Sequence, residues 1–213
     1  MVRTLSETTG VPLATVTDID RKLVKAGLRS KGGRGLYAAR MIPLDAARIL
    51  TAMLASARTT LAAAAVNRYA RTRVDPSRSS DGVFSASGLS DLATLAVEHS
   101  FVEGLAAVIA SAADGALARL LARAKNPSSF PHIEVFAFTE ATCGRIRLSG
   151  LPNRMTASVE YLPSPNPRGR RSPSPEGRAY GTSGDGGDLE QSRRVTERTI
   201  LAVANLLVVE PSS

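Results

Sequence analysis

The sequence predicts an α+β fold in which helices precede a small antiparallel sheet. Apolar residues recur every three or four positions through most of residues 1–125, which is the period of a helix with one buried face. The period changes to two in the segments 132–139, 144–149 and 156–162, which is typical of half-buried strands. A last apolar segment, 200–209, predicts a terminal helix that packs on the body of the protein.

Two helices are predicted at the start of the chain. The first covers residues 5–9 and ends at Gly10, and the second covers residues 12–26, with Pro12 in its first turn and Gly27 as its C-cap. The apolar stripe of the second helix consists of Val16, Ile19, Leu23 and Ala26. Residues 28–42 then predict two short strands, 28–31 and 36–41, around a glycine-rich tip.

The middle of the chain predicts long alanine-rich helices. Pro43 opens one helix, Leu44 to about Arg73, and a second covers residues 89–124 with a break near 113–115. The expected units are therefore 1–74, a connection at 75–88, and 89–213 with a flexible loop at 163–188.

The basic charge is concentrated near the N-terminus. The 213-residue chain has a net charge of +8, with 23 arginines and only four lysines. Residues 1–74 carry a net charge of +9, whereas the remaining residues carry −1. A bias toward arginine from a GC-rich genome would spread evenly, so the asymmetry favours an anionic partner for this end of the molecule.

Several classes of function lack the necessary residues. The single cysteine, Cys143, excludes an internal disulfide and a cysteine-based zinc site, and the only histidines are His99 and His132. Neither a catalytic triad nor metal-ligand spacing is present, so we expect no enzyme activity, no cofactor and no metal. The sequence also contains neither a secretory signal pattern nor a segment of about 18 apolar residues, which predicts a cytoplasmic protein with no membrane partner.

Residues 4–42 resemble the winged helix-turn-helix domain of bacterial transcriptional regulators. The resemblance rests on the segment Leu5 to Val16, with its Gly10-Val-Pro12 turn, followed by the helix end Leu23-Val-Lys-Ala-Gly27-Leu28 and a two-strand wing. It departs from that family in lacking a helix before Leu5, so the helix from Pro43 is expected to complete the three-helix unit. The resemblance implies a major-groove reading helix at 12–26 and a wing at 28–42 that contacts the DNA backbone or minor groove.

The same functional assignment follows from the exposed side chains. With the apolar stripe buried, polar residues face outward, and those near the N-terminus of a reading helix reach base edges whereas the later cations suit phosphates. The expected DNA-binding residues are Thr15, Thr17, Asp18, Arg21, Lys22, Lys25, Arg29, Lys31, Arg34 and Arg40. Asp18 and Asp20 have two roles open to them: they accept hydrogen bonds from cytosine, or they form salt bridges that orient Arg21 and Lys22.

A second basic cluster lies in the predicted flexible loop. Arg168, Arg170 and Arg171 precede a Ser-Pro-Ser-Pro segment. Such a segment makes non-specific contacts to nucleic acid through counterion release, although an ordinary solvated loop has the same composition.

The sequence therefore predicts a sequence-specific transcriptional regulator of bacterial or phage origin that binds double-stranded DNA. A homodimer through one of the alanine-rich helices would present two reading helices to a pseudo-palindromic site. A small-molecule effector has no residue signature. Two alternatives remain open: a DNA-binding subunit for phage packaging, partition or replication, and a winged-helix module that binds another protein.

Overall fold

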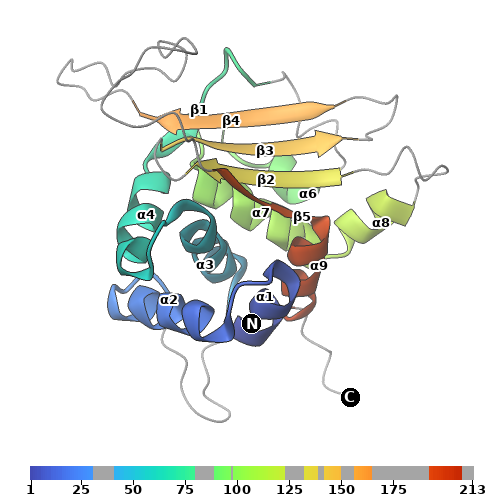
Figure 1. Ribbon diagram of the computed structural model, residues 1–213. Coiled ribbons are helices and arrows are strands. Elements are labelled where there is room, and N and C mark those ends of the chain that lie inside the picture. The colour runs from blue at the N-terminus through green and yellow to red at the C-terminus, as the bar shows by residue number, and fades with distance from the viewer. Residues whose placement is uncertain are drawn as a thin grey trace.

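The computed structural model describes residues 1–30, 41–79, 89–96, 98–122, 132–138, 142–149, 156–164 and 192–207. In these residues a five-stranded sheet lies against a layer of helices, with α6 and α7 behind the sheet and α1, α2 and α3 below it in the view of Figure 1. Every strand pair is antiparallel. The α+β class predicted from the sequence is confirmed.

The N-terminal helices are α1 (Val2–Thr9), α2 (Leu13–Lys25) and α3 (Pro43–Ala55). Gly10 ends α1 in the left-handed region at a φ of 73°, a conformation that glycine adopts without a steric penalty. Three of the four residues in the predicted apolar stripe of α2, namely Val16, Ile19 and Leu23, are buried.

The prediction of one continuous helix from Leu44 to about Arg73 is wrong. The chain leaves the helical region at Ser56 and forms a 3-10 turn, η2 (Thr59–Leu61), before α4 (Ala62–Tyr69) and the short strand β1 (Thr72–Val74). Turning back allows α4 to pack against α3 and bury the side chain of Tyr69. Tertiary burial here outweighs the uniformly high helix propensity of the alanine-rich sequence.

The second alanine-rich segment is divided twice. It forms α6 (Ser90–Ala93), α7 (Phe101–Ala113) and α8 (Ala116–Ala122), and the predicted break near 113–115 is confirmed. The break before α7 was not predicted, although Ser100 and Glu103 form a capping box there.

The sheet has the strand order β1-β4-β3-β2-β5. The three central strands are β2 (His132–Phe138), β3 (Gly144–Ser149) and β4 (Ala157–Pro163), which confirms the predicted meander. The edge strands β1 and β5 (Ser192–Thr196) were not predicted. The terminal helix is confirmed as α9 (Glu197–Asn205), which packs on α7 and α1.

The core contains residues from both sides of the expected connection at 75–88. One cluster of buried side chains joins Leu5, Leu50, Leu105, Val135 and Val203. Ten of the thirteen residues of α3 are buried, and α3 packs directly on α7. The small residues of α3 and α7 are therefore used inside one chain, and a homodimer through one of the alanine-rich helices stays a prediction.

A buried polar pair links the chain just before α7 to the sheet. The Nδ1–H of His99 donates to the carbonyl oxygen of Ala96 at 2.7 Å, so its Nε2 accepts from the Tyr161 hydroxyl at 2.8 Å. This arrangement holds the imidazole neutral, and burial lowers the pKa of His99. Gly104 passes close to the same hydroxyl, where a Cβ atom would overlap the Tyr161 oxygen.

Candidate nucleic-acid interface

The turn between α1 and α2 is fixed by local hydrogen bonds. Ser6 Oγ donates to the carbonyl oxygen of Val11 at 2.7 Å, and the amide of Gly10 donates to the carbonyl oxygen of Ser6 at 2.9 Å. The Val11 amide donates to Thr9 Oγ1 at 3.3 Å. Because these bonds satisfy polar groups on both sides of the turn, α2 is held in one orientation relative to α1.

The helix α3 packs next to these two helices. It packs against α2, and α1 packs against α2 from another side. The α1 helix begins at Val2, earlier than the predicted Leu5. The three helices share a core in which Leu5, Leu23 and Leu50 are fully buried.

A carboxylate on α3 holds both ends of the segment between Ser30 and Met41. Asp45 is 1 % exposed, and its Oδ1 accepts from the amide of Ser30 at 3.2 Å while its Oδ2 accepts from the amide of Ile42 at 3.5 Å. Arg48 donates to the carbonyl oxygen of Leu28 at 2.9 Å. Two side chains of α3 thus fix where this segment leaves the helical unit and where it returns.

The strands predicted for the wing are absent from the part of it that the structure describes. Residues 28 and 29 form a bend, and residues 30, 41 and 42 belong to no regular element. Backbone groups of Leu28, Ser30 and Ile42 bond to side chains of α3. Residues 31–40 lie outside the described part of the chain. The predicted contacts Lys31, Arg34 and Arg40 lie in that range, as Arg168, Arg170 and Arg171 do in the range 165–191.

Three polar residues of α2 lie one turn apart on its outward side. Arg21 and Lys25 are exposed and Thr17 is partly exposed, at the i, i+4 spacing that places side chains on one helix face. Thr17 donates a hydrogen bond to the carbonyl oxygen of Leu13 at 2.8 Å. Within the described ranges neither Arg21 nor Lys25 forms an ion pair. Thr15 is partly buried.

Two other predicted contacts form ion pairs with carboxylates of the same chain. Lys22 Nζ lies 2.6 Å from Asp18 Oδ2 and donates to Thr59 Oγ1 at 2.8 Å, which ties α2 to η2. The hydrogen bond from Lys22 lowers the pKa of Asp18. Of the two roles open to Asp18, the structure therefore contains the salt bridge to Lys22.

The pair of Arg29 and Asp20 is the more buried of the two. Arg29 Nη1 lies 3.0 Å from Asp20 Oδ2, and the two side chains are 18 % and 15 % exposed. Burial raises the pKa of Asp20, and Arg29 opposes that rise. This pair fastens the chain that follows α2 back onto the helix.

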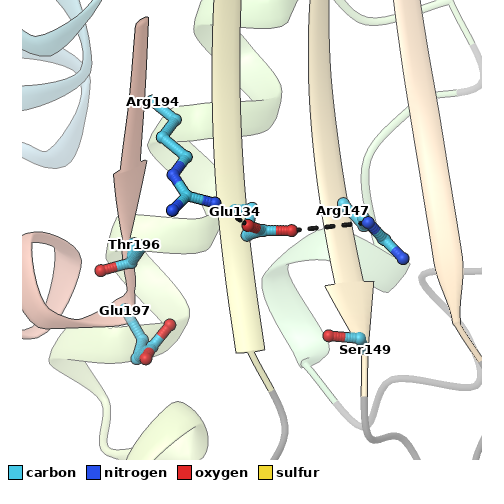
Figure 2. A pocket seen from close by; sticks show the side chains of 6 residues that line it. All are labelled: Glu134, Arg147, Ser149, Arg194, Thr196 and Glu197. Carbon is cyan, nitrogen blue, oxygen red and sulfur yellow. Dashed lines mark hydrogen bonds and ion pairs between the residues drawn. The ribbon is translucent and has the colours of Figure 1, made fainter.

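Sequence reasoning missed a second polar surface on the sheet. Alternate residues of the strands face away from the helices, and Figure 2 shows Arg194, Glu134 and Arg147 in a row across β5, β2 and β3. Glu134 pairs with Arg194 at 2.7 Å and with Arg147 at 3.7 Å, beside a shallow pocket of about 370 Å³. The alternation in Gly144–Ser149 could have revealed it, because it places Arg145 and Arg147 on one face.

The described residues include no group of three or more His, Cys, Asp or Glu side chains arranged to hold a metal ion. Among the described helices, none is both long enough and apolar enough to cross a bilayer. Comparison of the chain with protein-family models, with curated proteins and with solved structures gave no match.

Proposed function

We propose that the protein is a sequence-specific DNA-binding transcriptional regulator that contacts duplex DNA with α2 and with the segment between Ser30 and Met41. The observation that carries the proposal is the pair of helices α1 and α2, joined by the left-handed Gly10 turn, with α2 packed on α3 and Thr17, Arg21 and Lys25 facing outward. A single helix with one polar face fits the major groove, provided that its other face is fixed to a domain.

Each outward residue has a different task in this proposal. Thr17 lies nearer the N-terminus of α2, where a short hydroxyl side chain reaches base edges. Arg21 and Lys25 follow toward the C-terminus and contact phosphates, which gives affinity but little sequence preference. The carboxylate of Asp45 anchors the amides of Ser30 and Ile42, which flank residues 31–40. In the proposal, the basic residues between them contact the neighbouring backbone or minor groove.

Lys22 and Arg29 stabilise the position of α2 through ion pairs within the chain. Their pairs with Asp18 and Asp20 fix α2 against η2 and against the chain that follows it. We assign them to positioning α2 rather than to direct phosphate contact.

A dimer fits the proposal because two copies of α2 would read a pseudo-palindromic site in the cytoplasm of a bacterium. Because the small residues of α3 and α7 pack inside one chain, we assign the surface that joins the two copies to other elements.

The test is fluorescence anisotropy with random duplexes and with duplexes selected from genomic fragments by the protein itself. We expect selection to yield one site that binds at least about a thousandfold more tightly than random duplex. Arg21→Gln should weaken binding to both kinds of duplex about tenfold, whereas Thr17→Val should weaken mainly the binding to the selected duplex. Arg119→Gln, on the exposed side of α8, is the matched control and should change neither.

Two other outcomes would replace the proposal. A ring of many subunits in light scattering, with duplex binding but no selected site, would favour a packaging, partition or replication subunit. The absence of salt-dependent duplex binding would favour a module that binds another protein.

A further inference from the structure

We infer that the outer face of the sheet is a second nucleic-acid surface, which binds single strands through Phe136 and the arginines beside it. The inference rests on β2, β3 and β5 and does not require that α2 bind DNA.

The strand register places an aromatic residue between two arginine positions on the neighbouring strands. Phe136 of β2 is directly opposite Arg145 of β3 on one side and Arg194 of β5 on the other. Side chains at such paired positions are about 5 Å apart at their Cβ atoms. Phe138 follows on the same face, about 7 Å further along an extended strand. Both rings are partly exposed.

Two residues before Phe136 on β2, the same face carries the carboxylate of Glu134. It is directly opposite Arg147 on β3 and Thr196 on β5, and it forms the two ion pairs drawn in Figure 2. On the far side of Arg145, Glu160 of β4 pairs with that guanidinium at 2.6 Å.

The arginines extend further into solvent than their partners do. The side chains of Arg145, Arg147 and Arg194 are 43 %, 47 % and 60 % exposed, whereas those of Glu134 and Glu160 are 19 % and 20 % exposed. A guanidinium group has five N–H donors, and a carboxylate beneath it uses only one or two of them. An anion that approaches the sheet therefore meets donors first, without first breaking the ion pairs.

Partly exposed aromatic rings flanked by arginines match the chemistry of a single strand. Unpaired bases stack on aromatic side chains, and arginines bind the phosphates or stack on the bases. Duplex DNA keeps its bases stacked inside the helix, so they are not available to stack on the ring of Phe136. An acidic peptide would use the arginines but not the rings. The combination on this face therefore favours single-stranded nucleic acid.

The experiment measures anisotropy of labelled oligo(dT) and oligo(U) of about 12 nucleotides with the full chain, the two oligomers distinguishing DNA from RNA as the source of the strand. Phe136→Leu keeps the apolar bulk but removes the ring, and Phe136→Tyr keeps the ring. We expect Phe136→Leu to weaken binding about tenfold, within the range that one lost stacking contact produces. The tyrosine variant should bind like the original protein.

Charge is tested separately with the double change Arg147→Gln and Arg194→Gln, which should also weaken binding of the strand about tenfold. Arg119→Gln, on the exposed side of α8, is the control and should leave binding of the single strand unchanged. Far-ultraviolet circular dichroism and thermal unfolding confirm that each variant is folded.

Three results would overturn the inference: binding of neither oligomer at low salt, equal binding by the leucine variant, or equally effective displacement of the strand by poly-glutamate. The last result would identify a general anion surface instead. A failure here leaves duplex binding by α2 unaffected, because the Arg21→Gln assay on duplex DNA reports on that surface alone.

Discussion

The outward face of α2 and the outer face of the sheet both present basic side chains, but their carboxylates are placed differently. On α2, Asp18 and Asp20 draw Lys22 and Arg29 into pairs that hold the protein together. Arg21 and Lys25 remain outside those pairs. On the sheet, the carboxylate side chains are only 19–20 % exposed, whereas the side chains of their arginine partners are 43–60 % exposed.

This difference teaches that charge counted along a segment does not give the charge of a surface. The first 42 residues carry a net charge of +5, yet two of the cations expected to bind DNA form ion pairs with carboxylates of the same chain. Residues 126–167 are neutral in sum, yet they contribute two exposed arginines to the outer face of the sheet. The three-dimensional position of each carboxylate decides how a cation is used.

Removing the Asp45 carboxylate should weaken duplex binding by the α2 surface and leave binding to the outer face of the sheet unchanged. In Asp45→Ala the amides of Ser30 and Ile42 lose their acceptors, so we expect the free energy of unfolding to fall by about 1–3 kcal/mol. Duplex affinity should fall as well, because the segment 31–40 loses its anchor. Urea denaturation and anisotropy measure the two effects.

Asp45→Asn is the matched variant, since the amide retains one oxygen acceptor and the same shape. It should lose less stability than the alanine variant, and both should bind oligo(dT) as the original protein does. Equal stability of Asp45→Ala and the original protein would show that the carboxylate does not hold the segment.

Acidification should instead affect both faces together, because His99 lies in the core that supports them. The folded protein resists protonation of His99, whose pKa is lowered from 6.5, whereas the unfolded chain takes up the proton near that value. The free energy of unfolding should therefore fall as the pH is lowered through about 6.5, by at most about 1.4 kcal/mol per pH unit. The loss ends below the pKa of the folded state.

Urea denaturation between about pH 7.5 and pH 5 measures this effect, with His99→Gln as the comparison. Glutamine cannot titrate, so the difference between the two proteins isolates the histidine from the carboxylates. The negative charge of Glu103 acts on His99 and opposes the decrease in the pKa of the imidazole. Parallel pH profiles of the two proteins would contradict the assignment of a neutral, buried imidazole.

The smallest effect is expected for Lys22. Because its ammonium group already bonds to Asp18 and Thr59, Lys22→Gln should weaken duplex binding by less than about threefold, against about tenfold for Arg21→Gln. Anisotropy on the selected duplex decides between the two positions. A larger loss for Lys22 than for Arg21 would place the DNA on the η2 side of α2.

Local patterns predicted much of the fold. Gly10 and Pro12 marked the turn, the stripe through Val16, Ile19 and Leu23 marked the buried side of α2, and alternation marked the three central strands. These signals work because each depends on a few neighbouring residues. The break at Ser56 escaped prediction because alanine-rich sequence favours a helix on both sides of it, and packing of α4 on α3 decided the turn.

Contacts between distant residues account for the missed parts of the site. Arg194 meets Glu134 across sixty positions, and Arg193 bonds to the carbonyl oxygens of Met53 and Ser56 at the end of α3. Neither contact leaves a local pattern in the sequence. The pair of Lys22 and Asp18 was one of the two roles that the sequence left open for Asp18, and it has the i, i+4 spacing of a helix.

The central claim, that α2 contacts duplex DNA through Arg21 and Lys25, is tested most directly by the salt dependence of duplex affinity. Anisotropy over a salt series gives the slope of log affinity against log salt for the original protein and for the double variant Arg21→Gln/Lys25→Gln. Each lost phosphate contact should reduce the slope by about 0.9, so we predict a decrease of about 1.8. An unchanged slope would contradict the claim.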